Sequence, residues 1–267
     1  MEKKKRFDRV KGHTTNLAIV KFVLGAVGLS LYVYTGGTLL YAMFLYVIFG
    51  LMVQLAAACY HRWITHKVIE PTLVGKGILW FCLVSVGNLR PSTYAIIHRM
   101  HHKYSDTEND PHPTTVGLWR FMIGNYSYRP NNTEVDGKKI MFSVPILDLY
   151  RRKDIVFVDK YYWYLYAMTL IVFAFIDVQL AMLSFPFLVL RYHVQHAIFN
   201  YITHGGKEKQ TPQDLNIFPG IFFFGEHLHK THHLNQSLAN YGSISKFNFD
   251  YMYYFLYHLK LIKRQNE

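Results

Sequence analysis

Residues 39–66 read LLYAMFLYVIFGLMVQLAAACYHRWITH. The run from Leu39 to Cys59 contains no charged side chain. Its length matches the ~20 residues that a helix needs to cross the hydrocarbon core of a bilayer. Two histidines, His61 and His66, follow directly where this run ends. The stretch therefore predicts a membrane helix that carries imidazole groups at its polar end.

Three further apolar runs accompany this one, and tight turns at Gly36-Gly37 and at Asp177 separate neighbouring runs. Buried helices of a soluble bundle are the alternative, but such long runs with so little polar patterning argue against it. The whole chain, residues 1–267, is expected to be a single all-α integral membrane domain. Its four transmembrane helices are expected at about residues 17–34, 39–59, 161–176 and 178–199.

The distribution of charge predicts the orientation. The chain has 29 Lys and Arg against 17 Asp and Glu, a formal net charge of +12. The basic residues are not gathered in one arm, so we do not expect a nucleic-acid partner. Of the 29, 26 lie in residues 1–11, 67–160 and 205–267, and none lies in the two turns. By the positive-inside rule both termini are cytoplasmic. The cytoplasmic segments are then 1–16, 60–160 and 200–267, a helical cap that carries the histidines.

Most of the 15 histidines fall into three groups. His98, His101 and His102 have the spacing i, i+3, i+4, as do His229, His232 and His233, and residues so spaced share one face of a helix. His61 and His66 are five apart, which places them about 140° apart on a regular α-helix. These two either serve different metals or lie where the helix is distorted.

The fourth span adds Asn200 and His204, which are one helical turn apart. Nine clustered histidines and one amide then lie on the predicted cytoplasmic side. Imidazole suits iron, zinc, copper and nickel. Nine ligands exceed the needs of one metal and match two metals that keep open positions.

The order of these motifs, HxxxxH, HxxHH, NxxxH and HxxHH, resembles the integral-membrane fatty acyl desaturase family. Residues 98–112, HRMHHKYSDTENDPH, are similar to the second histidine box and its trailing Asp-Pro-His in the acyl-CoA and acyl-lipid branch. Residues 225–229, GEHLH, resemble the entry to that branch's third box. The resemblance covers about residues 58–240.

The resemblance implies an O₂-dependent di-iron enzyme that removes two hydrogens from an acyl chain and introduces a double bond. An acyl-chain hydroxylase or an acetylenase on the same site is the alternative, and a non-redox membrane zinc protein is a remote one. The implied iron ligands are His61, His66, His98, His101, His102, His204, His229, His232 and His233. Asn200 matches the family position that reaches an iron through water.

The same resemblance implies the partners. The substrate is a fatty acyl ester of CoA, of a carrier protein or of a phospholipid. Only 34 residues follow His233, so a separate electron donor, such as ferredoxin or cytochrome b5, is expected. A bacterial inner membrane is favoured over the endoplasmic reticulum.

Some positions depart from the family pattern. His227 stands where relatives often have a small residue, and Lys230-Thr231 replaces a usual Asn-containing pair. Tyr94 occupies an aromatic position that is often Trp. The headgroup contacts of acyl-CoA members are therefore not carried over.

Polar residues near the boxes are candidates for supporting roles. Metal-bound histidines usually donate their second N–H to a carboxylate or a carbonyl, and Asp106, Asp110 and Glu226 lie beside the boxes. Ordinary helix caps and surface charges are the alternative for these three. His193 and His196 are ~16 and ~12 Å before His204 along a helix axis, too far to share its iron. The candidates for the substrate tunnel or the headgroup, with structural hydrogen bonds as the alternative for those in the fourth span, are Arg90, Tyr94, Arg191, His193 and His196.

Overall fold

The structure is a computed structural model. It describes residues 13–107, 110–111, 114, 117–124, 134–135, 138–139, 147–206, 211–216, 222–223, 225–244 and 249–263. The described part of the chain is helical, apart from a hairpin of two short strands and the connecting segments. The all-helical class expected from the sequence is therefore confirmed.

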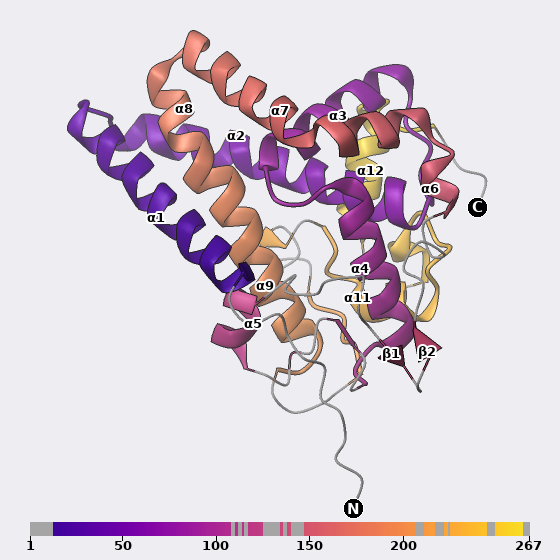
Figure 1. Ribbon diagram of the computed structural model, residues 1–267. Helices are drawn as coiled ribbons and strands as arrows, with labels where there is room; N and C mark the ends of the chain where they lie inside the picture. The colour runs from indigo at the N-terminus through magenta and orange to yellow at the C-terminus, as the bar shows by residue number, and fades with distance from the viewer. Residues whose placement is uncertain are drawn as a thin grey trace, which may run out of the picture.

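The elements follow one another in the order drawn in Figure 1. The helices are α1 (His13–Tyr34), α2 (Leu39–Ala58), η1 (Cys59–Thr65), α3 (Leu73–Val86), α4 (Pro91–Tyr104), α5 (Leu118–Gly124), α6 (Leu147–Tyr150), α7 (Lys153–Ile176), α8 (Val178–Ser184), η5 (Phe185–Leu190), α9 (Arg191–Thr203), α11 (His229–Leu234), η6 (Tyr241–Ile244) and α12 (Tyr251–His258). The strands are β1 (Glu134–Val135) and β2 (Lys138–Lys139).

Two tight turns order the long helices. Gly36, with a φ of 77°, lets the chain reverse after α1, and the Thr38 side chain accepts a hydrogen bond from the Tyr41 N–H to begin α2. Asp177 does the same for α8 by accepting from the Gln179 N–H. From that turn α8, η5 and α9 form one long rod that descends beside α1 (Figure 1).

Directly after α2 the helix changes from the α form to the π form. The chain continues from Ala58 into the π-helix η1, and the His66 N–H donates to the His61 carbonyl over 3.0 Å. A π-helix bonds residues five apart, so the distortion brings His61 and His66 to the same side. The rod contains a second π-helix, η5, which includes Pro186, a residue that has no N–H to donate.

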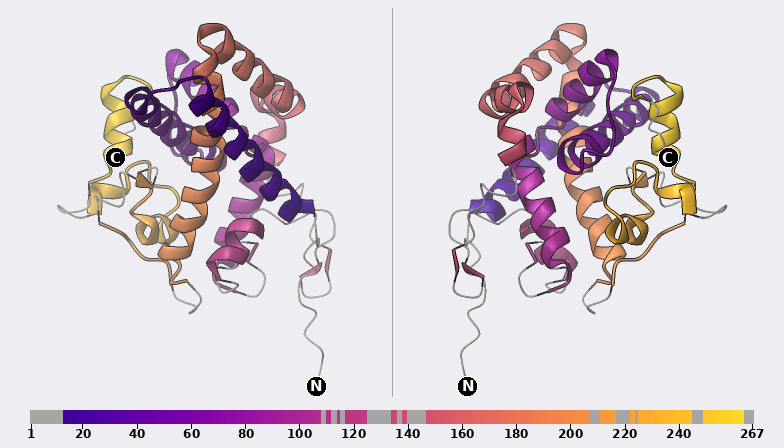
Figure 2. Two further views of the ribbon diagram at one scale, coloured as in Figure 1. Left: turned by 90° about the vertical axis from the view of Figure 1, so that its left-hand side faces the viewer. Right: turned by 90° about the vertical axis from the view of Figure 1, so that its right-hand side faces the viewer.

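A sharp corner joins α3 to α4. Gly87 ends α3 in the left-handed conformation, with a φ of 59°, and Pro91 is the first residue of α4. The two helices meet at 86°. The corner sends α4 down toward α9 and α11, away from the α7–α8 turn (Figure 2). The ends of η1, α4, α9 and α11 thereby meet in one region.

One helix of the described chain, Leu39–Thr65, is long and apolar enough to cross a membrane, and the bent pair α3–α4 passes the same test jointly. The helices at the third and fourth expected spans differ in their bounds or regularity from the apolar runs of the sequence. The third lies in α7, which begins eight residues earlier with the charged residues Lys153 and Asp154. The fourth is divided by η5 and contains Arg191. Four transmembrane helices therefore remain a prediction.

The packing of α3 on the C-terminal segment gives a test of the fold. Residues 70–72 pair with residues 261–263, and the Thr72 N–H donates to the Leu261 carbonyl over 2.9 Å. A Cβ atom at Gly75 would overlap that same carbonyl oxygen, whereas a Cβ at Gly77 would meet nothing within 4 Å. The two glycines lie in the same helix and form a matched pair.

We expect Gly75→Ala to lower the free energy of unfolding by about 1–3 kcal/mol, because backbone must move to admit the methyl group. Gly77→Ala should be neutral or stabilise by up to about 1 kcal/mol, because alanine favours a helix. Thermal unfolding of the two variants in detergent measures the difference. Equal melting temperatures would contradict the described contact between α3 and Leu261.

Candidate metal centre

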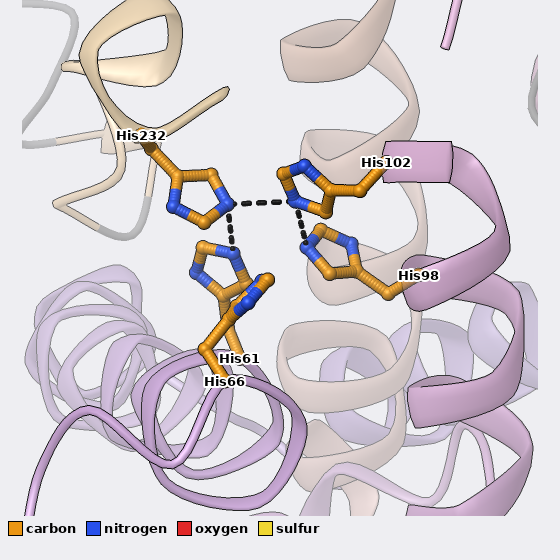
Figure 3. A group of neighbouring side chains, drawn as sticks. All are labelled: His61, His66, His98, His102 and His232. Carbon is orange, nitrogen blue, oxygen red and sulfur yellow. Dashed lines mark hydrogen bonds between the residues drawn. The ribbon is translucent and has the colours of Figure 1, made fainter. Parts of the chain in front are cut away.

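Nine histidines converge in two neighbouring groups. Cluster one comprises His61, His66, His98, His102 and His232 (Figure 3). Cluster two comprises His101, His204, His229 and His233. Within each group, one ring nitrogen per residue lies within 4.8 Å of all the others. The nine residues are the nine that the sequence motifs single out.

The second and third histidine boxes each serve both clusters. His98 and His102 of α4 enter cluster one, while His101 between them enters cluster two. The third box is reversed, since His229 and His233 of α11 enter cluster two and His232 enters cluster one. Residues four apart in a helix thus share a cluster, and the residue at i+3 turns to the other one. The shared face expected from the spacing is divided between two sites.

Three carboxylates orient three of the imidazoles. Glu226 Oε2 lies 2.9 Å from His61 Nδ1, Asp110 Oδ1 lies 2.9 Å from His101 Nδ1, and Asp106 Oδ1 lies 3.1 Å from His204 Nδ1. These are the three acidic residues that the sequence marks beside the boxes. In a neutral imidazole, an Nδ1–H that donates to a carboxylate leaves the lone pair on Nε2.

The Nε2 atoms face one another at very short range. The distance from His204 Nε2 is 3.2 Å to His101 Nε2 and 2.8 Å to His229 Nε2. Burial alone would lower the pKa of His101, but the Asp110 carboxylate raises it above the ordinary histidine value. When both rings are neutral, the facing Nε2 atoms of His101 and His204 both present lone pairs, and a proton or a metal ion between them would relieve the repulsion. Cluster one shows the same convergence, because His232 Nε2 lies 2.9 Å from His61 Nε2 and 2.8 Å from His102 Nε2. The donor set therefore fits metal ions in both clusters.

Burial keeps the third-box imidazoles in their ligand form. Removal from water, followed by the neighbouring imidazoles, lowers the pKa of His229, His232 and His233 below the ordinary histidine value. These rings are neutral at pH 7 and keep a lone pair for a metal. Burial alone would raise the pKa of the Glu226 carboxyl, but the Arg62 guanidinium and the His61 ring lower it to about 2. Glu226 is therefore ionised where it lies beside the His61 ring.

Asn200 and its neighbours in α9 lie outside the two clusters. The Asn200 amide donates to the His196 carbonyl over 2.8 Å and lies 3.2 Å from the His196 ring. His196 also stacks on Tyr192. His193 Nε2 donates to the Met122 carbonyl over 2.7 Å. These contacts are hydrogen bonds and a ring stack within the bundle, and a role of His193 and His196 in the substrate tunnel stays a prediction.

The remaining tunnel and headgroup candidates lie at two places, since Arg90 and Tyr94 share one turn at the start of α4 and Arg191 lies beside α2. Tyr94 stacks on the ring of His98, with centroids 5.5 Å apart and planes at 11°, so it forms a wall of cluster one. Arg90 is exposed before the first turn of α4. The Arg191 guanidinium donates to the Tyr46 carbonyl over 2.7 Å and covers the Tyr46 ring. His112 of the second motif lies outside the described residues.

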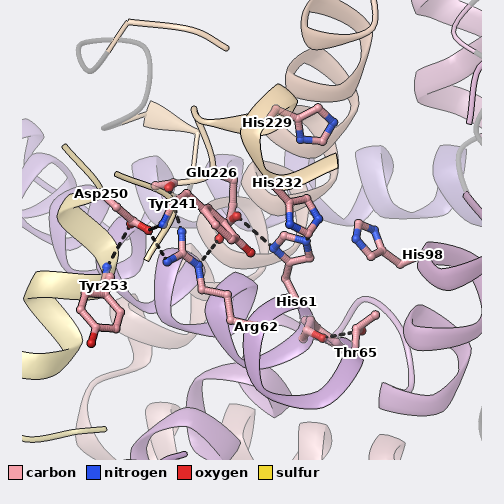
Figure 4. Close-up of polar contacts among 12 residues, drawn as sticks. His61, Arg62, Thr65, His98, Glu226, His229, His232, Tyr241, Asp250 and Tyr253 are labelled. Atoms are coloured by element: carbon pink, nitrogen blue, oxygen red, sulfur yellow. Dashed lines mark hydrogen bonds and ion pairs between the residues drawn. The ribbon is translucent and has the colours of Figure 1, made fainter. Parts of the chain in front are cut away.

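Two arginines of the site are not among the residues predicted from the sequence. Arg62 is fully buried and reaches Glu226 and Asp250 (Figure 4). Arg99 donates from Nε and Nη2 to the Thr65 carbonyl, at 3.0 and 2.8 Å, and forms an ion pair with Asp148. Both arginines directly follow the first histidine of a box, and this repeated His-Arg pair is the signal that was available in the sequence. Asp250 carries no such signal, because it lies far from the boxes along the chain.

The fold and the site define a class: a helical protein with two histidine clusters, each of which could hold a metal ion, beside an apolar helix. The family model described as "Fatty acid desaturase" matches residues 36–242. The chain belongs to this family.

Curated relatives lie at low identity. An icosanoyl-CoA 5-desaturase of Limnanthes douglasii is 27% identical over 197 residues, which are 69% of this chain and 52% of that protein. An sn-1 stearoyl-lipid 9-desaturase of Synechocystis is 27% identical over 199 residues, 68% of this chain and 57% of that protein. An acyl-CoA Delta-12 desaturase of Tribolium castaneum is 30% identical over 150 residues, 55% and 40% of the respective chains. The chain spans about half the length of the curated relatives it matches.

The carboxylates that contact the imidazoles predict that their loss weakens metal binding without abolishing it. Asp110→Asn should weaken metal binding at cluster two about 10- to 100-fold, because the amide fixes neither the orientation nor the tautomer of His101 as a carboxylate does. Titration of metal-free protein with Co²⁺, followed by visible absorption, measures the affinity. Asp154→Asn, which removes a partly exposed ion pair with Arg152, is the matched control and should bind as the unmodified protein does. Equal affinity of both variants would show that Asp110 does not support the site.

Proposed function

We propose that this protein is an O₂-dependent membrane di-iron fatty acyl desaturase, an oxidoreductase that removes two hydrogens from an acyl chain and leaves a double bond. The observation that carries the proposal is the pair of histidine clusters, with nine converging ring nitrogens, in a chain of the fatty acid desaturase family. The relatives named above act on acyl-CoA or on acyl lipids, and a fatty acyl ester is the substrate proposed here.

Two iron ions held by clusters one and two would supply the activation of O₂ and the abstraction of hydrogen from the acyl chain. With carboxylates beside their Nδ1 atoms, His61, His101 and His204 would present their Nε2 atoms to the ions. Tyr94 covers the ring of His98, and both side chains are buried. The wall therefore keeps water from that side of cluster one.

A separate electron donor is part of the proposal. His102 of cluster one and His233 of cluster two are both partly exposed, and their ring centroids lie only 4.3 Å apart. This edge, where ligands of both clusters meet, is the part of the centre nearest to solvent. It suits the docking of a protein such as ferredoxin or cytochrome b5.

The proposed reaction is tested by the products formed in cells. Expression of the chain with a compatible donor should yield a new unsaturated fatty acid, identified by gas chromatography and mass spectrometry of the cell lipids. His101→Ala should abolish this product, because it removes a ligand of cluster two. His258→Ala, on the exposed end of α12, should leave the product unchanged. A hydroxylated or acetylenic product would change the reaction assigned, and an active His101→Ala protein of normal metal content would contradict the di-iron site.

The proposed topology places four spans in the bilayer, with both termini and the histidine clusters on the cytoplasmic side. The large apolar side chains exposed on α1, α2 and α7, such as Val33, Leu40, Val47 and Phe175, support contact with lipid. The turn near Gly36 joins α1 to α2 and the turn at Asp177 joins α7 to α8, so both turns are then external.

Cysteine labelling tests this topology. Tyr34→Cys, beside the Gly36 turn, should react with a membrane-impermeant maleimide added to intact cells. Lys153→Cys, which is exposed at the start of α7, should react only after the membrane is opened. The two native cysteines, Cys59 and Cys82, are buried and give a low background. The reverse pattern of labelling would contradict the orientation.

A further inference from the structure

Arg62 is a buried charge at the centre of the molecule. It follows His61 in η1, and its side chain is 0% exposed. Its Nε donates to Glu226 Oε1 over 2.8 Å, its Nη1 donates to Asp250 Oδ2 over 2.7 Å, and its Nη2 donates to the Gly225 carbonyl over 3.2 Å. The guanidinium also lies 4.2 Å from the centroid of the Tyr241 ring. All these partners belong to the segment 225–250, which contains the third histidine box (Figure 4).

Glu226 is held from two sides. One carboxylate oxygen, Oε1, accepts from Arg62, and the other, Oε2, lies 2.9 Å from His61 Nδ1. The hydrogen bond from Arg62 and the ion-pair contact with His61 fix the carboxylate between the two side chains. The His61 ring then has Nδ1 at the carboxylate and Nε2 in cluster one. The Arg62 contact therefore reaches a proposed metal ligand through one intervening side chain.

In cluster two, the carboxylate that contacts a histidine is held by a residue close to it in the sequence. Asp110 Oδ1 lies beside His101, and Asp110 Oδ2 accepts from the Asp106 N–H over 3.0 Å, within one short turn. Glu226 lies in the extended segment that leads into α11, far along the chain from His61. The Glu226 carboxylate is held instead by Arg62, a residue that is distant from it in the sequence.

We propose that Arg62 is a positioning residue for cluster one, which fixes Glu226 and through it His61, and which joins the first histidine box to the segment of the third. The inference rests on the proposed function of the two clusters as metal sites. It predicts that loss of the Arg62 fork weakens metal binding at cluster one about 10- to 100-fold, the range found for outer-shell partners of metal ligands. Cluster two should retain its affinity and serve as an internal reference.

The test measures metal content and the spectrum of each site, in addition to activity. Full-length protein is purified in detergent from ⁵⁷Fe-supplemented cells, and its iron is quantified and recorded by Mössbauer spectroscopy. His66→Ala identifies the signal of cluster one, and His229→Ala that of cluster two. In Arg62→Gln and Arg62→Lys we expect selective loss of the cluster-one signal. Lysine keeps the charge but has no fork that reaches both Glu226 and Asp250, so it should not restore the site.

Two controls separate positioning from folding. Arg152→Gln removes another arginine that packs on η1, 4.7 Å from the centroid of the Trp63 ring, and should keep both signals. Asp250→Asn weakens the Arg62–Asp250 ion pair and the cap of α12, and it leaves the Arg62–Glu226 contact in place. It should lower the melting temperature and keep both signals.

The outcomes are decisive. Both signals present in Arg62→Lys, or both lost together in proportion to thermal stability, would overturn the proposal and leave Arg62 as a structural clamp. Failure of both Arg62 variants to give folded protein would lead to the same conclusion. If the unmodified protein itself holds no second metal, the proposed function fails first, so the two failures are distinguishable.

Discussion

The structure depends on one electrostatic constraint, which is that nine imidazole nitrogens are held together in a small, mostly buried volume. Ring nitrogens about 3 Å apart, as in His101 and His204, repel one another when both present lone pairs, and burial disfavours protonation of the third-box rings. A bound cation removes the repulsion. The energy of metal binding is then also folding energy, and it offsets the cost of gathering the ends of η1, α4, α9 and α11 in one place.

Local geometry determines which ring goes to which cluster. The π-helix η1 brings His61 and His66 to one site, although they would diverge on a regular α-helix. In α4 and α11 the four-residue pairs stay together and the third histidine turns to the other cluster. The carboxylates Asp106, Asp110 and Glu226 then fix the tautomers that face the centre. Backbone irregularity and acidic partners thus act on the same feature, the direction of Nε2.

Much of this arrangement could be predicted from the sequence. The nine histidines and the three carboxylates were identified from spacing and from the resemblance, since periodicity and motif order are local signals that need no tertiary structure. The helix distortion at His61–His66 was left open as one of two alternatives, because spacing alone cannot distinguish a π-helix from two separate metals. The distribution of the boxes between the clusters depends on how α4 and α11 face each other, and no local pattern encodes it. The roles of Arg62 and Asp250 depend on contacts across 188 residues, and composition gives no sign of them.

The distribution of ligands has a consequence for how the centre assembles. The second and third boxes each contribute to both clusters, whereas the first box contributes to cluster one alone and His204 to cluster two alone. Neither cluster can therefore close before α4 and α11 have met, and once they have met, each metal stabilises the docking that the other requires. Binding at the two sites should accordingly be coupled through the shared helices, since whatever binds only the docked state favours it by mass action. The Arg62 contacts act at the same junction, because they join η1 to the segment that precedes α11. The two histidine clusters are thus better understood as one unit than as two independent sites that happen to be adjacent.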